Sequence, residues 1–179
     1  MGDKANIRYF FDVKDYLKKG ISCITANYPF LKHRNNDYMA IMKDCVQALK
    51  FIQENASKWQ IDTSRIAVAG TSADALITEY LSYHTKDVRV MGAILQPMGT
   101  EANVIPLVKQ GVPPLIIYQP SPNSDFIHHP NNAKSLKKAY DQLKIECELY
   151  GSKKNDINPL PRGKNHKEAF MKSFLKHLQ

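Results

Sequence analysis

Residues 66–75 read IAVAGTSADA, and this stretch decides the fold. The run Ile66–Gly70 has no polar alternation, which is typical of a strand in a parallel sheet that is buried on both faces. Residues Ala73 to His84 follow at once with the pattern of a helix. The stretch therefore predicts a strand that turns sharply into a helix, with Ser72 at the turn.

Strands and helices alternate along the rest of the chain. Further strands are predicted at Ile21–Ala26, Val88–Gln96, Pro114–Gln119 and Glu146–Tyr150, and further helices at Arg8–Lys19, Asp37–Lys58, Glu101–Gln110, Asn131–Lys144 and Lys167–Leu178. This alternation indicates βαβ units, which form a parallel sheet covered by helices. We expect an α/β fold: a three-layer sandwich with a mainly parallel sheet of about five strands and helices on both faces, in a single domain over residues 1–179.

The composition is that of an ordinary globular protein. Hydrophobic residues make up 43% of the chain and charged residues 23%, which argues against a disordered or fibrous protein. The 25 Lys and Arg residues exceed the 17 Asp and Glu residues, giving a net charge of +8. The lysines are scattered in short pairs with no run of alternating basic and aromatic residues, so we expect no nucleic-acid partner.

Three further classes are disfavoured by the sequence. No stretch approaches the roughly 18 apolar residues that span a membrane, so no membrane partner is expected. The first residues lack the apolar core of a signal peptide, which predicts a cytoplasmic protein, or a secreted one if an upstream signal segment is missing from this chain.

Cys23, Cys45 and Cys147 lie far apart without a C-x-x-C pair, which argues against a disulfide framework and a zinc site. We expect no metal and no organic cofactor.

The turn at Ser72 has the residues that a catalytic serine needs. A tight strand-to-helix turn lifts the hydroxyl above the sheet, and the helix behind it directs N–H groups at a developing oxyanion. Gly70, Ala73 and Ala75 are small enough for the close approach of the two backbones, whereas Asp74 stands where the nucleophile-elbow pattern has Gly. The alternative is that Ser72 only caps the following helix.

A candidate acid and then a candidate base follow Ser72 along the chain, which is the order of serine, acid and histidine in this architecture. Asp125 lies just past the strand Pro114–Gln119, and His166 lies after the strand Glu146–Tyr150, immediately before the last helix. Asp125 has the alternative of stabilising a turn, and His166 that of capping a helix. His128 and His129 compete as bases, but they lie beside Asp125 and not after the final strand.

These segments resemble the α/β-hydrolase family, in its esterase/lipase branch. The resemblance is carried by residues 20–28 (GISCITANY), 44–56 (DCVQALKFIQENA) and 61–73 (IDTSRIAVAGTSA), and it extends over nearly the whole chain. It implies a serine hydrolase that cleaves carboxylic esters through an acyl-enzyme, on small-molecule or polysaccharide-linked substrates. Ser72 would be the nucleophile, Asp125 the acid and His166 the general base. The N–H of Ala73 would be one oxyanion-hole donor.

The sequence departs from this family in two ways. Asp74 replaces a glycine, and the His-Gly-Gly loop that supplies further oxyanion donors in the family is not found in this sequence. By the resemblance we expect the chain to start just downstream of that loop and of the family's first three strands. The strands Ile21–Ala26 and Ile66–Gly70 would then pair directly, or a partner chain would fill the slot between them in a homodimer. The alternative function is a truncated, catalytically weak or inactive homologue that serves as a binding or assembly module.

Overall fold

The computed structural model describes residues 11–98 and 103–179. The chain divides into two compact units, Met1–Thr63 and Ser64–Gln179. The expectation of a single domain over residues 1–179 stays a prediction. All the candidate catalytic residues belong to the second unit.

The first unit is helical in its described part. It contains α1 (Val13–Leu17), the 3-10 helix η2 (Leu31–Arg34), α2 (Tyr38–Glu54) and α3 (Ala56–Trp59). Asp37 caps α2, since its side chain accepts a hydrogen bond from the N–H of Ala40 at 3.0 Å. The predicted helix Asp37–Lys58 is interrupted at Asn55. The predicted helix Arg8–Lys19 is shorter than expected because Asp12 caps α1, while Arg8 to Phe10 lie outside the described residues.

The strand predicted at Ile21–Ala26 is wrong, because the structure has no strand there. A strand is held by hydrogen bonds to a neighbouring strand, and in the described part of the chain the four sheet strands pair only with one another. Ile24 is 49% exposed, so the segment is also not buried as a central strand would be. The β-branched composition of this segment therefore does not by itself produce a strand.

The second unit is built on a parallel sheet of four strands in the order β1-β2-β3-β4. The strands are β1 (Ile66–Thr71), β2 (Val88–Ile94), β3 (Leu115–Gln119) and β4 (Cys147–Gly151). These agree with four of the five predicted strands to within two residues at their ends. All three neighbouring pairs are parallel, and the register aligns Thr71 with Ile94 and Ile94 with Tyr118.

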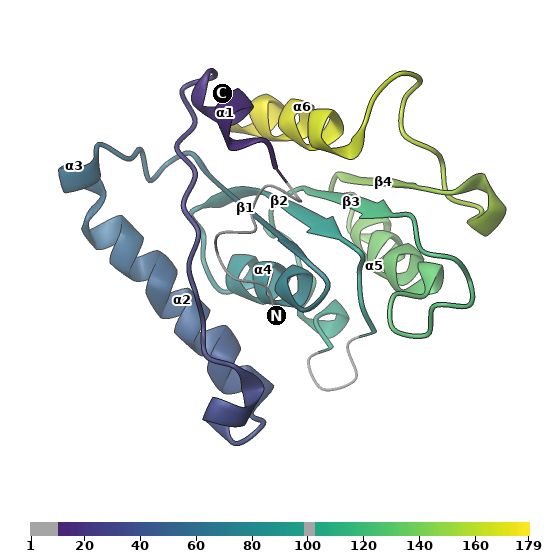
Figure 1. Ribbon diagram of the computed structural model, residues 1–179, viewed down its shortest axis with the longest axis horizontal. Helices are drawn as coiled ribbons and strands as arrows, with labels where there is room; N and C mark the ends of the chain where they lie inside the picture. The colour runs from purple at the N-terminus through teal and green to yellow at the C-terminus, as the bar shows by residue number, and fades with distance from the viewer. Residues whose placement is uncertain (1–10, 99–102) are drawn as a thin grey trace. The chain divides into compact units, whose positions relative to one another are not determined.

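Helices cover both faces of this sheet, as expected for an α/β sandwich. The helix α6 (His166–Leu178) packs on one face, over β1, β2 and β3 (Figure 1). The opposite face carries α4 (Ala73–Tyr83) over β1 and β2 and α5 (Pro130–Gln142) over β3 and β4. The 3-10 helices η3 (Ile105–Leu107) and η4 (Lys153–Asn155) lie in the connections. The predicted helix Glu101–Gln110 is wrong for most of its described part, because residues 103–110 contain only η3; residues 101 and 102 lie outside the described part.

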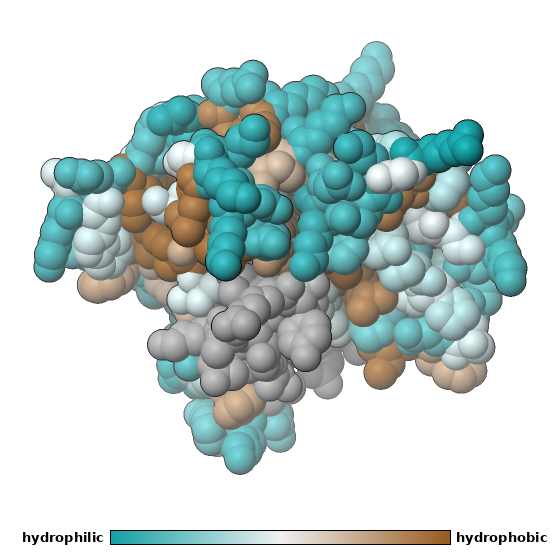
Figure 2. Space-filling view, turned by 45° about the horizontal axis from the view of Figure 1, so that its top comes forward, coloured by the Kyte–Doolittle hydropathy of each residue, from teal (hydrophilic) through white to brown (hydrophobic). Residues whose placement is uncertain are grey.

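The molecular surface is rich in hydrophilic side chains. Figure 2 shows them over much of one face, with smaller hydrophobic patches between them. Among the described residues, every helix is too short or too polar to cross a bilayer.

The contact between β2 and α6 leaves no room for a side chain at Gly92. A Cβ there would lie 2.5 Å from Cε1 of Phe170 and 3.0 Å from Cζ of Phe174. We expect Gly92→Ala to lower the free energy of unfolding by about 1–3 kcal/mol, because the added methyl group displaces a packed ring. Urea unfolding measures this, and Gly92→Ala combined with Phe170→Leu should cost less than the sum of the two single changes. Equal stability of Gly92→Ala and the wild type would contradict this packing.

Candidate active site

The turn between β1 and α4 holds Ser72 in a strained conformation. Ser72 has φ 53° and ψ −123°, outside the regions that non-glycine residues usually adopt. Gly70 makes the turn sterically feasible, because a Cβ at this position would collide with the backbone of Asp74 in the first turn of α4. The backbone N–H of Ser72 donates to the carbonyl oxygen of Ile94 at 2.9 Å, which ties the turn to the end of β2.

The side chain of Ser72 does not cap α4, although Ser72 stands at the N-cap position. Its Oγ lies 2.8 Å from Nε2 of His128 instead. The capping alternative for this serine is therefore wrong. A hydroxyl bonded to an imidazole nitrogen is the arrangement in which a serine can lose its proton as it attacks.

The loop after β3 brings His128 and Asp125 together. The Nδ1 atom of His128 lies 3.2 Å from Oδ2 of Asp125, and the backbone N–H of His128 donates to Oδ1 at 2.8 Å. The N–H of Ile127 donates to the same Oδ1 at 3.0 Å. Ser72, His128 and Asp125 thus form a continuous hydrogen-bonded chain. The side chain of His128 is 18% exposed and that of Asp125 is 31% exposed, so solvent reaches the site.

Asp125 is held as a carboxylate. The hydrogen bond from the backbone N–H of His128, followed by the contacts with its imidazole, lowers the pKa of Asp125 despite partial burial. An ionised carboxylate on Nδ1 favours the tautomer of His128 that has its hydrogen on Nδ1 and a free lone pair on Nε2. That lone pair faces the hydroxyl of Ser72.

His166, the base that the sequence favours, is the first residue of α6. Its ring stacks on that of Tyr118 in β3, with centroids 5.1 Å apart and an interplanar angle of 8°. Burial, and to a smaller extent the neighbouring Lys167, lowers the pKa of His166, so its imidazole is neutral near pH 7. In the described part of the chain no hydrogen bond joins it to Ser72. Its role as a base stays a prediction.

The remaining candidates occupy structural positions. Ala73, the predicted oxyanion donor, begins α4, and Asp74 lies in the first turn of the same helix. The side chain of His129 caps α5 by accepting a hydrogen bond from the N–H of Asn131 at 3.2 Å. His129 is therefore engaged away from Ser72. No group of three or more His, Cys, Asp or Glu side chains suited to a metal occurs in the described residues.

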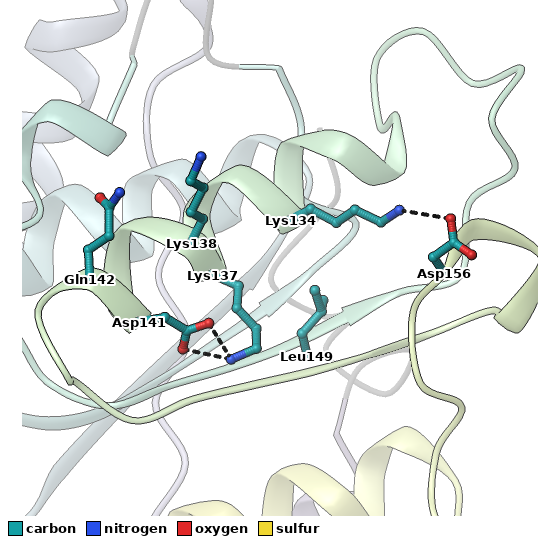
Figure 3. Close-up of a pocket in the computed structure, with 7 residues that line it drawn as sticks. All are labelled: Lys134, Lys137, Lys138, Asp141, Gln142, Leu149 and Asp156. Atoms are coloured by element: carbon teal, nitrogen blue, oxygen red, sulfur yellow. Dashed lines mark hydrogen bonds and ion pairs between the residues drawn. The ribbon is translucent and has the colours of Figure 1, made fainter.

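The described part of the second unit contains hollows near the His128 loop and along α5. One of about 180 Å³ is next to the His128 loop, since Met98 and Asn132 in its wall both donate to the carbonyl oxygen of Ile127. It is lined by Leu76, Gln96, Pro97, Met98, Asn103, Val104, Ile105, Asn132 and Ser135. The other, of about 490 Å³, lies along α5 and is lined mainly by lysines and their carboxylate partners (Figure 3). In it Lys137 pairs with Asp141 and Lys134 with Asp156, so most of its charge is neutralised.

Sequence reasoning missed a buried polar chain beside the site. Glu79 in α4 is fully buried and accepts a hydrogen bond from Nε2 of Gln96 at 3.1 Å. The backbone N–H of Gln96 donates to Oε1 of Gln119 at 2.6 Å, and Nε2 of Gln119 donates to the carbonyl oxygen of His128 at 2.5 Å. The sequence does carry a sign of this polar chain, since a glutamine stands at or just past the end of each of two apolar strands. Gln119 ends β3, and Gln96 follows the end of β2. The corresponding sequence signal for the contact between Asp125 and His128 is their spacing of three residues.

Comparison with known proteins identifies the family. The profile of the BD-FAE family matches residues 1–108, more than half of the chain. The chain belongs to this family, an α/β-hydrolase type of esterase domain. Among curated proteins, none matches the chain.

Solved structures share the fold. An esterase from Thermogutta terrifontis, Est2 with propionate bound, is 14% identical with a TM-score of 0.72, over 98% of this chain and 76% of the other. Esterase B from Lactobacillus rhamnosis, inhibited by a tributyrin phosphonate, is 12% identical with a TM-score of 0.70, over 98% and 71%. A lipase/esterase from Lactobacillus plantarum is 12% identical with a TM-score of 0.61, over 77% and 67%. The fold is that of a shortened α/β-hydrolase core.

The buried Glu79 predicts a specific dependence of stability on pH. Burial raises the pKa of the Glu79 carboxyl from 4.5 to about 8, and the hydrogen bond from Gln96 offsets part of this rise. The folded state therefore holds a proton that the unfolded state releases between these two values. The resulting stabilisation is complete below the unfolded pKa and is lost as the pH rises toward about 8, by at most about 1.4 kcal/mol per pH unit.

Urea unfolding of the wild type and of Glu79→Gln between pH 5 and 8 tests this. The wild type should lose stability relative to Glu79→Gln as the pH rises, because other titrating groups contribute equally to both proteins. Parallel stability curves would show that Glu79 does not carry the proton.

Proposed function

We propose that this chain is a carboxylic ester hydrolase in which Ser72 is the nucleophile, His128 the general base and Asp125 the acid. The observation that carries the proposal is the hydrogen-bonded chain from Ser72 Oγ to His128 Nε2 at 2.8 Å and from His128 Nδ1 to Asp125 at 3.2 Å. Membership of an esterase family supports the reaction class. The strained φ of Ser72 supports its role, because such strain is concentrated at functional sites.

The first half of the reaction transfers the acyl group to the serine. Ser72 Oγ attacks the ester carbonyl carbon while Nε2 of His128 takes the hydroxyl proton. The tetrahedral intermediate collapses, the bond to the alkoxy oxygen breaks, and the imidazolium gives its proton to the departing alcohol. Asp125 stabilises the imidazolium by its negative charge and holds the ring in place. The N–H of Ala73, at the start of α4, is the proposed donor to the oxyanion.

The second half returns the serine by the same route. Water attacks the acyl carbon and gives a proton to His128, the bond to Ser72 Oγ breaks, and the proton passes back to that oxygen. The products are a carboxylic acid, an alcohol and the unchanged enzyme. The carboxyl ends of the strands, where this site lies, are the usual location of active sites in such sheets.

His166 is the second candidate for the base. It is neutral near pH 7, which a base requires, and it stands before the last helix, where the sequence resemblance expects the histidine. The contact of Ser72 with His128 favours His128. The two hypotheses predict opposite results when each histidine is replaced separately. If His128 is the base, replacing it abolishes most of the activity and replacing His166 does not; if His166 is the base, the reverse holds.

The proposed substrates are esters with a small acyl group. The hollow next to the His128 loop has a volume of about 180 Å³, smaller than the 300–1,000 Å³ of sites for drug-sized ligands. Two of the similar structures hold propionate and a tributyrin phosphonate, which supports short acyl chains. A small-molecule alcohol and a polysaccharide hydroxyl are both compatible with the solvent-exposed site.

Hydrolysis of p-nitrophenyl acetate by single variants tests the proposal. We expect Ser72→Ala to lower kcat/KM by about 10⁴-fold or more, and His128→Gln by about 10²–10⁴-fold. His166→Gln should retain activity within about tenfold, because it removes no proton acceptor from Ser72 in this arrangement. His84→Gln, at the exposed end of α4, is the matched control and should be unchanged.

The alternative outcomes separate the parts of the proposal. Loss of activity in His166→Gln with full activity in His128→Gln would transfer the base role to His166. Full activity in Ser72→Ala would refute the serine mechanism itself. A folded wild type without measurable hydrolysis of acetate, propionate or butyrate esters would favour the catalytically inactive binding module.

A further inference from the structure

Gln119, the last residue of β3, has a fully buried side chain with three hydrogen-bond partners. Its Oε1 accepts from the N–H of Gln96 at 2.6 Å, and its Nε2 donates to Ser121 Oγ at 3.1 Å and to the carbonyl oxygen of His128 at 2.5 Å. The N–H of Gln96 can only donate and the carbonyl of His128 can only accept. The amide of Gln119 is therefore fixed in one orientation.

The loop that carries His128 has little apolar anchoring at its centre. Phe126 is 83% exposed and Ile127 is 62% exposed. Polar contacts hold this segment instead: the carbonyl oxygen of Ile127 accepts from Met98 and Asn132, and that of His128 accepts from Gln119. The position of His128 consequently depends on hydrogen bonds rather than on packing.

The backbone of His128 is fixed on both sides of its side chain. Its N–H donates to Asp125, and its carbonyl oxygen accepts from Gln119. Asp125 also contacts the imidazole itself, so it holds the residue within its own loop. Gln119 is different, because it connects this loop to the sheet.

The other contact of Gln119 leads to the strand end that holds the nucleophile. Gln96 lies two residues after Ile94, whose carbonyl oxygen accepts the N–H of Ser72. Between them Leu95 has φ 55°, a conformation that non-glycine residues adopt only at an energetic cost. The side chain of Gln96 continues to Glu79 in α4, the helix that Ser72 precedes. Gln119 thus joins the base loop to the strand and helix that position Ser72.

We propose that Gln119 is a positioning residue for ester hydrolysis, which sets the approach of His128 Nε2 to Ser72 Oγ by binding the carbonyl of His128 and the N–H of Gln96. This inference rests on the proposed function with His128 as base. Gln119 contacts neither the reacting atoms nor the substrate hollow, and it acts through the position of His128.

Gln119→Met tests this role, since it keeps the length of the side chain and removes both donors and the acceptor. Active sites are first counted by titration with paraoxon, so that unfolded protein does not enter the rate. We expect kcat per titrated site for p-nitrophenyl acetate to fall by about 10²-fold with a smaller change in KM, because displacement of a base by about 1 Å costs this much. The apparent pKa of the group that governs kcat should fall, because a displaced imidazole is less well stabilised by Asp125.

Two further variants keep the test decisive. Gln119→Glu retains an acceptor for the N–H of Gln96 but cannot donate to His128 when ionised, and it should show the same loss if Gln119→Met does not fold. Gln142→Met makes the same change at the exposed end of α5 and should leave kcat per site unchanged. An unchanged kcat per site and an unchanged pH profile in Gln119→Met would overturn the inference while leaving the proposed function intact.

A double-mutant series separates this inference from the proposed function. In a His128→Gln background, Gln119→Met should cause little further loss, because both changes act through the same group. A full additional loss would show that Gln119 acts elsewhere and would overturn the inference. Wild-type activity in His128→Gln alone would refute His128 as the base, and the positioning role with it.

Discussion

The close approach of the α4 backbone to Gly70 is the constraint on which the site depends. Only a residue without a Cβ lets the chain leave β1 and enter α4 across so short a distance. The consequence is the strained backbone of Ser72, whose hydroxyl points away from the helix cap and toward His128. The hydrogen bond from Ser72 N–H to Ile94 ties this strained residue to the sheet. Ser72 is therefore preorganised by the backbone geometry of the second unit.

The proposed base and acid lie in a short loop after β3 that folds back on itself. Asp125 and His128 are three residues apart, and one carboxylate binds both the backbone and the ring of the histidine. Such local contacts orient the imidazole but do not fix the loop against the sheet. The buried amide of Gln119 makes that connection, and Glu79 extends it to α4. The four strands of the described sheet thus support a continuous hydrogen-bonded chain from Ser72 through His128 to Asp125.

The sequence predicts the sheet and the turn at Ser72 better than the histidine that contacts Ser72. The runs at β1 to β4 are apolar without alternation, and the small residues around Ser72 predict its turn directly. Ile21–Ala26 has an equally β-branched composition but is not a strand. A strand requires hydrogen bonds to a neighbouring strand, and the composition of a segment does not show whether such a neighbour is present. The sequence favours His166 over His128 as the base because His166 follows the last strand. The contact of His128 with Ser72 arises from the fold of a loop beside Asp125. The sequence does not single out Gln96 and Gln119, because their hydrogen-bond partners lie in other elements of the fold.

The measurement that tests the central claim most directly is labelling of the folded chain with a fluorophosphonate probe, followed by mass-spectrometric mapping of the modified peptide. Such a probe reacts with a serine only when a base activates it. The account predicts a single modification at Ser72 that is lost in His128→Gln and retained in His166→Gln. A folded chain that stays unmodified, or one labelled equally well without His128, would contradict it.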